Sequence, residues 1–272
     1  GQDDAGYDLR GPAPAVGQVI VKTSTFKLKN AKVAIKVMGM GLDARQSITA
    51  EEEEEVKYLA VTGRQVTKAQ TRMVKDQAKI TTSLGGADMP EEKTGELEGE
   101  VIVSERTGPG KWKHALVDAR PSAKQKKELD KRVGPESDDD LYPAGTHKVG
   151  FKWAVDASAL QRIFGGAITE LKGKLDMEFL RVEDLDGEKC AVVSAKGRIT
   201  GIAKEDEGDM NVELTMDGLT WRSLKSGLDV KDQAKGRMRM SGKVDMDGVK
   251  AELDLEGPIT IDGTAKLRKT TK

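Results

Sequence analysis

The segment that decides the fold reads MNVELTMDG, at residues 210–218. Apolar residues occupy every even position from 210 to 216 and alternate with polar ones. Because successive side chains of a strand point to opposite faces, this period of two predicts a half-buried β-strand. The same alternation occurs at residues 32–37, 171–179 and 249–255.

Turn dipeptides punctuate these segments. Asp-Gly occurs at residues 186–187, 217–218, 247–248 and 262–263, and both residue types tolerate the positive φ angles of tight hairpin turns. Long strands joined by such turns form a meander, and long twisted strands curl into a barrel or half-barrel. The sequence therefore predicts a mainly β protein of long antiparallel strands, arranged in two curved sheets or half-barrels.

Two short helices are predicted from their end signals. Ser122 and Gln125 form a capping-box pattern at the start of a helix over 123–133, which Gly134 ends. Asp156 is a suitable N-cap for a second helix over 157–164, followed by two glycines.

The chain divides into four predicted regions. Residues 1–17 are polar and contain two prolines, which favours a flexible N-terminal tether. An N-terminal β lobe (18–117) and a C-terminal β lobe (145–272) flank a polar linker with a short helix (118–144). The hexapeptide VKDQAK occurs at both 74–79 and 230–235, which favours an internal duplication of the two lobes.

Composition excludes several classes of protein. The 45 basic and 46 acidic residues are interleaved, whereas a nucleic-acid binder carries a basic excess or stripe. No apolar run approaches the roughly 20 residues of a membrane-spanning helix, so a soluble chain is expected. Cys190 is the only cysteine, and neither His114 nor His147 lies at a metal-ligand spacing from another His or Cys. We therefore expect no metal and no cofactor.

Two motifs suggest enzyme chemistry but sit in the wrong local structure. Residues 39–44 match the dinucleotide fingerprint G-x-G-x-x-A, which needs a helix directly after it. Ser24 and Lys27 fit S-x-x-K, which needs both side chains on one helical turn. Both segments alternate like strands, so no catalytic residue is predicted. Acidic runs at 51–55, 138–140 and 205–209 lack calcium-site spacing and are interpreted as solvated faces.

Methionines supply the candidate ligand-binding residues. Met side chains are pliable and polarizable, and a curved sheet lined with them can hold a lipid-like ligand. The alternative is that Met fills a core that is poor in aromatic residues, of which the chain has ten. The candidates are Met210, Met216, Met238, Met240 and Trp221.

A resemblance to a known family is carried by LYP (141–143), KVGFKW (148–153) and DGEKCAVV (186–193), with LEG (97–99) and the strand near Met38 in support. These stretches resemble an uncharacterised family of exported, β-rich bacterial proteins, mostly from planctomycete-like bacteria. The resemblance implies an extracytoplasmic protein, periplasmic or secreted, with lipid anchoring as a further option. It implies no catalytic residues.

The functional prediction is a non-enzymatic, envelope-associated binding or scaffold protein that holds an apolar or lipid-like ligand in a curved sheet. Its partner would be a lipid-like molecule or an envelope component, not nucleic acid. Two alternatives stay open. One is a glycan hydrolase working through paired carboxylates. The other is a module that binds proteins through an exposed strand edge.

Overall fold

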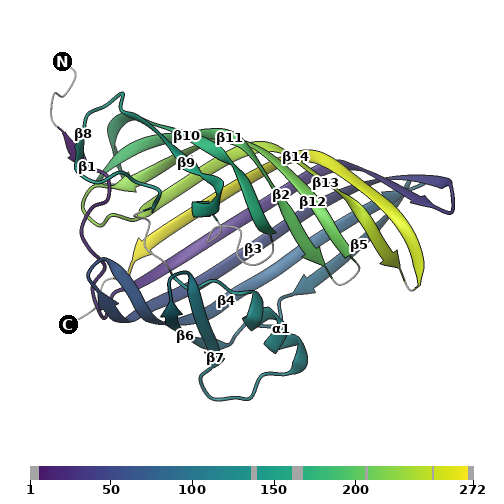
Figure 1. Cartoon of the computed structure of the whole chain (residues 1–272), viewed down its shortest axis with the longest axis horizontal. Coiled ribbons are helices and arrows are strands. Elements are labelled where there is room, and N and C mark those ends of the chain that lie inside the picture. The colour runs from purple at the N-terminus through teal and green to yellow at the C-terminus, as the bar shows by residue number, and fades with distance from the viewer. Residues whose placement is uncertain (1–5, 136–139, 161–167, 206–207, 247, 269–272) are drawn as a thin grey trace.

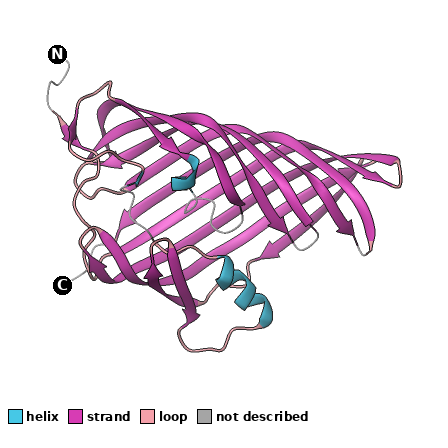
Figure 2. Cartoon of the chain, in the orientation of Figure 1, coloured by secondary structure: helices cyan, strands magenta, loops and turns pink. Residues whose placement is uncertain are grey.

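The computed structural model describes residues 6–135, 140–160, 168–205, 208–246 and 248–268. Long antiparallel strands dominate it (Figures 1 and 2). The long strands are β2 (Val19–Val37), β3 (Met40–Thr62), β4 (Gln65–Leu84), β10 (Ile168–Leu185), β11 (Glu188–Glu205), β12 (Gly208–Ser223), β13 (Asp229–Met246) and β14 (Val249–Leu267). The shorter ones are β1 (Tyr7–Asp8), β5 (Ala87–Thr94), β6 (Val101–Gly108), β7 (Lys111–Leu116), β8 (Thr146–His147) and β9 (Lys152–Asp156).

Twelve strands form one continuous sheet in the order β7-β6-β4-β3-β2-β14-β13-β12-β11-β10-β9, with β5 paired to β4. In the described part of the chain, β7 and β9 are the two end strands of this order. The two lobes predicted from the sequence share this single sheet, because β2 pairs with β14 from Ile20 opposite Leu267 to Val37 opposite Ala251. The prediction of long antiparallel strands in a meander is confirmed, whereas the two separate sheets are replaced by one.

The sheet curls, so that its two ends come round in front of the central strands in Figure 1. We call the face inside this curl the inner face and the opposite one the outer face. Leu28, Leu214 and Met238 belong to the main apolar cluster of the inner face. Helix α1 (Ala123–Lys131) packs on the same face through Leu129, which contacts the cluster of Met73 and Ile102. Helix α1 therefore covers part of the inner face.

The outer face is largely a lattice of exposed ion pairs. Arg198 pairs with Glu213, and Arg237 pairs with Glu256, across neighbouring strands. Such exposed pairs each contribute little to stability. These charged side chains keep the outer face in contact with solvent, whereas the apolar residues of each alternating strand are buried on the inner face.

Both predicted helices have counterparts among the described residues. Ser122 Oγ accepts a hydrogen bond from the Gln125 backbone N–H, and the Gln125 side chain accepts one from the Ser122 backbone, so the capping box is present. In the described part of the second predicted helix, a 3-10 helix, η2, spans Ala157–Leu160. The rest of that predicted helix lies outside the described residues.

The Asp-Gly turn predictions are correct at 186–187 and wrong at two other places. Asp186 and Gly187 join β10 to β11 with φ angles of 54° and 83°. Asp217-Gly218 instead lies inside β12, and residues 262–263 lie inside β14. At Gly218 the missing side chain allows close approach of the next strand, since a Cβ atom would lie 3.0 Å from Ala234 Cβ. Gly248 lies in the β13–β14 turn with a φ angle of 84°, and Asp247 is outside the described residues.

The N-terminal stretch predicted to be a tether is partly built into the fold. Tyr7 and Asp8 pair with His147 and Thr146 in a small separate sheet, and Leu9 is fully buried in the main apolar cluster. Composition does not reveal this anchor, because it depends on contacts with residues far away in the sequence. No helix among the described residues is long and apolar enough to cross a membrane.

Candidate functional site

The inner face brings the four candidate methionines together. Met210 and Met238 are buried in the main apolar cluster, and Met216 and Met240 are half-buried against it. In the register of β12 and β13, Val212 faces Met240 and Leu214 faces Met238, so the methionines are interleaved with branched residues. Two of the four thus fill the core, and the other two lie at its margin.

A band of half-buried apolar side chains continues from this margin across the central strands. These residues pack against the main cluster without being fully buried, and they come from β2, β3, β13 and β14. The central band consists of Phe26, Ile35, Ile48, Met240 and Leu253. Because these side chains keep some contact with solvent, they are the part of the inner face that an apolar ligand could reach.

Trp221, the fifth candidate, lies on the outer face. It packs with Cys190 and Val192, its indole N–H donates to the Glu183 carboxylate, and the Lys231 ammonium lies 4.6 Å from its ring centroid. The parity of β12 explains this, because residue 221 has the opposite parity to Met210 and Met216. Burial raises the pKa of the Cys190 thiol to about 11, so the thiol stays protonated and unreactive at neutral pH.

A charged group sits on the inner face beyond the apolar band. Glu54 is mostly buried, and its carboxylate oxygens lie 3.7 Å from Lys22 Nζ and 3.3 Å from Arg132 Nη2. Glu52 is two residues away on β3 and so on the same face. Its side chain reaches solvent, but partial burial and the charge of Glu54 raise its pKa.

The sequence interpretation of residues 51–55 as a solvated face is therefore half correct. Glu51 faces Gln77 in the register of β3 and β4 and pairs with Lys75 on the outer face. Glu52 and Glu54 share the parity of buried Val56, and that parity is the signal that could have assigned them to the inner face. Among the described residues, no group of His, Cys, Asp and Glu side chains is arranged to hold a metal ion.

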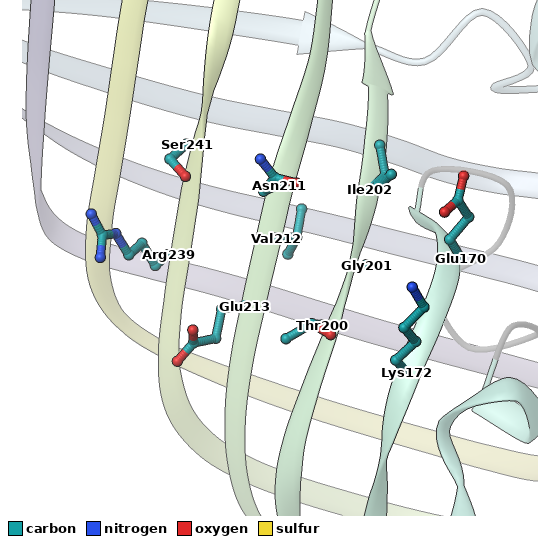
Figure 3. A pocket seen from close by; sticks show the side chains of 10 residues that line it. All are labelled: Glu170, Lys172, Thr200, Gly201, Ile202, Asn211, Val212, Glu213, Arg239 and Ser241. Atoms are coloured by element: carbon teal, nitrogen blue, oxygen red, sulfur yellow. The ribbon is translucent and has the colours of Figure 1, made fainter.

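A polar hollow of about 430 Å³ opens on the outer face of β10–β13 (Figure 3). An adjoining hollow of about 450 Å³ shares Asn211 and Ser241 with it. In the first hollow, Glu213 is paired with Arg198 and Arg239 with Asp254. Glu170 and Lys172 also line this hollow, so a ligand there would meet charged groups as well as neutral polar ones such as Thr200.

The two enzyme motifs fall where the sequence predicted, in strands. Ser24 and Lys27 lie in β2, three residues apart and therefore on opposite faces. Residues 39–44 form the β2–β3 turn and the start of β3, with no helix after them. Neither motif has the geometry that its chemistry requires.

No protein-family model matches the chain, and no curated protein is significantly similar to it. Among solved structures, a DUF1329 family protein from Desulfovibrio piger aligns at 9% identity over 94% of this chain and 88% of its own, with a TM-score of 0.14. OpdK of Pseudomonas aeruginosa, solved with vanillate, aligns at 6% identity over 90% of this chain and 99% of its own, with a TM-score of 0.15. At such low TM-scores, neither likeness bears on function.

Proposed function

We propose that the protein is a non-enzymatic, extracytoplasmic and envelope-associated binding or scaffold protein, and that an apolar or lipid-like ligand occupies its inner face. The observation that carries the proposal is the half-buried band of Phe26, Ile35, Ile48, Met240 and Leu253 inside an unclosed curl. Burying the remaining apolar surface of such side chains against an acyl chain is favourable by about 25 cal/mol per Å².

The inner face also has the layout of a binding site with two ends. The apolar band leads toward the charged group of Lys22, Glu54 and Arg132, which lies on the same face. A lipid-like molecule has a long apolar part and one polar end, and such an arrangement can orient it. The localisation rests on the family resemblance of the middle of the chain.

The test is uptake of a fluorescent C18 fatty acid by the delipidated full chain. We expect saturable binding that weakens about tenfold in Met240→Ser, because the band loses an apolar contact. Lys235→Gln, on the outer side of the same strand, is the matched control and should bind like the wild type. Absence of saturable uptake by the wild-type protein would contradict the proposal.

One observation favours a second candidate, a hydrolase acting through carboxylates. Glu52 and Glu54 lie side by side on the inner face, and the raised pKa of Glu52 suits a proton donor beside a carboxylate that is held by two cations. Turnover of a glycan that is lost in both Glu52→Gln and Glu54→Gln, with folding intact, would favour this candidate over the first.

The strand-edge alternative is disfavoured by the edges themselves. Edge strand β7 contains Lys111 and Lys113, β9 begins at Lys152, and β5 contains Pro90. Lysine and proline are the residues with which proteins block pairing at exposed edges, and all three strands are short.

A further inference from the structure

The β2–β3 hairpin ends in an apolar tip, which we define as residues 37–42. Met38 is 87% exposed, Met40 71% and Leu42 47%. At the same end of the sheet, Val249 at the start of β14 is 41% exposed. Figure 1 shows this end of the sheet opposite the end that carries β1 and β8. An exposed apolar group of this kind marks an interaction site more often than chance.

The turn at the tip has an unfavourable residue for its backbone shape. Met38 and Gly39 have φ angles of 49° and 81°. The β10–β11 turn has nearly the same angles but uses Asp186 and Gly187, and the β4–β5 turn uses two glycines. Asn, Asp and Gly favour this shape, and an unbranched apolar side chain does not. The backbone of the turn therefore does not account for methionine at position 38.

The tip continues the inner face. Met40 pairs with Val37 and Leu42 with Ile35, so both side chains follow the parity of the apolar band. β3 pairs with β4 only from Ala44 onward, so residues 40–43 extend beyond β4. An acyl chain leaving a lipid layer at the tip would meet an apolar surface all the way to the inner face.

Three lysines near the tip can supply cations to phosphate headgroups, although each stands opposite a carboxylate in the strand register. Lys36, Lys243 and Lys250 are exposed on the strands that reach this end, and none forms an ion pair among the described residues. Farther along the same strands, Arg239 is paired with Asp254. The neighbourhood also contains Asp43, Asp245 and Glu252, of which Asp245 accepts a hydrogen bond from the Gly248 backbone N–H. The long lysine stems can reach phosphates while the apolar side chains insert.

We propose that the tip docks onto a phospholipid surface, with Met38, Met40 and Leu42 inserted among the acyl chains and Lys36 and Lys250 at the headgroups. A narrow, convex hairpin suits a lipid layer, which needs no matching groove. The inference deepens the proposed function, on which it rests, by naming where the protein would meet the envelope.

The experiment is flotation of the full chain with vesicles of phosphatidylcholine and phosphatidylglycerol in equal parts, compared with pure phosphatidylcholine. We expect Met38→Asn to lower the partition coefficient about tenfold and Met40→Ser/Leu42→Ser about a hundredfold, since each apolar side chain contributes roughly one factor of ten. Lys36→Gln should weaken binding only to the anionic vesicles.

Met38→Asn also separates binding from folding. It creates Asn-Gly, the preferred dipeptide for this turn, so the variant should unfold at a higher temperature while it binds vesicles less. Val16→Ser is the matched control, because Val16 is 64% exposed but precedes β2, far from the tip, and it should bind like the wild type.

Unchanged vesicle binding in the tip variants would overturn the docking proposal, as would a wild-type chain that ignores vesicles or only self-associates through the tip. If the wild-type chain takes up the fatty acid but ignores vesicles, the docking site alone is refuted. If vesicles bind through the tip but no fatty acid is taken up, the ligand on the inner face is refuted instead.

Discussion

Among the described residues, Arg222 is the largest fully buried side chain, at 2% exposure. Its guanidinium donates to Asp229 Oδ1 at 2.8 Å and to the carbonyl oxygens of Leu9 and Arg10, and it lies 3.9 Å from the ring centroid of Tyr142. A buried charge is tolerated only when it is paired and hydrogen-bonded in this way. Arg222 thereby fastens the N-terminal segment and the region around Tyr142 to the sheet.

We expect Arg222→Lys to lower the free energy of unfolding by about 2–4 kcal/mol, because lysine cannot reproduce the planar fork of donors. Urea unfolding followed by circular dichroism measures this. The matched control is Arg237→Lys on the outer face, where the exposed ion pair with Glu256 limits the cost to about 0.5 kcal/mol. Equal losses in the two variants would contradict the anchoring role.

Glu52 gives a pH prediction at the same scale. Partial burial and the Glu54 carboxylate raise its pKa in the folded state, so ionisation of Glu52 opposes folding. The contribution of protonated Glu52 to the free energy of unfolding is therefore complete below the pKa of the unfolded chain, about 4.3. It is lost as the pH rises through the pKa of Glu52 in the folded state. We expect Glu52→Gln to unfold at higher urea than wild type at pH 7, and the gain to shrink as the pH falls to 4.

Glu53→Gln is the control for this titration, because residue 53 points to the outer face of the same strand, opposite Lys75 in the register. It should show no gain at neutral pH. A gain in Glu52→Gln that stays constant from pH 4 to pH 7 would show that charge on Glu52 is not its cause.

At the scale of the element, α1 depends on its capping box. Ser122→Ala removes the acceptor for the Gln125 backbone N–H and should lower the free energy of unfolding by about 1 kcal/mol. For a protein of this size the melting temperature should fall by about 2–4 °C. Ser122→Asp keeps an acceptor at the cap and should restore the wild-type value, which calorimetry can check.

The elements that the sequence predicted well are those whose signals are local. Period-two alternation and the capping box depend only on neighbouring residues, so the long strands and α1 could be read directly. The Asp-Gly dipeptide at residues 217–218 was misleading, because Asp-Gly occurs both in tight turns and within strands where a neighbouring strand approaches closely. Only the strand that lies opposite, with Ala234, decides between them.

The candidate site was harder to predict because it depends on which face of a strand is inside. Parity places Met210 with Met216 on one face of their strand and Met238 with Met240 on one face of theirs, but it cannot say that Met210 and Met238 are buried while Met240 stays at the margin. That difference is set by the curl of the sheet and by the segments laid on its inner face. The pairing of Glu54 with Arg132 joins β3 to the end of α1, a contact that no local pattern encodes.

At the scale of the whole molecule, the β2–β14 pairing decides how many units the protein has. After β7 the chain leaves the sheet and continues through α1 on the inner face. It rejoins the sheet at the opposite edge with β9, and its last strand, β14, pairs with β2. Strands far apart in sequence are therefore neighbours, and contacts of this separation couple the two predicted lobes while slowing folding.

We expect the two predicted lobes to unfold as one cooperative unit. In a variant whose only tryptophan is Trp112, the tryptophan fluorescence reports on residues 18–117. In a variant whose only tryptophan is Trp221, it reports on residues 145–272. Their urea unfolding curves should coincide, as two-state behaviour requires. Thr260→Pro, in the middle of β14 opposite Lys27, should shift both curves together, because proline cannot donate to the ladder of a central strand. Lys93→Pro in the edge strand β5 should shift both far less. Separate transitions, or a Thr260→Pro effect confined to the Trp221 curve, would show that the lobes are independent domains that meet only at the β2–β14 pairing.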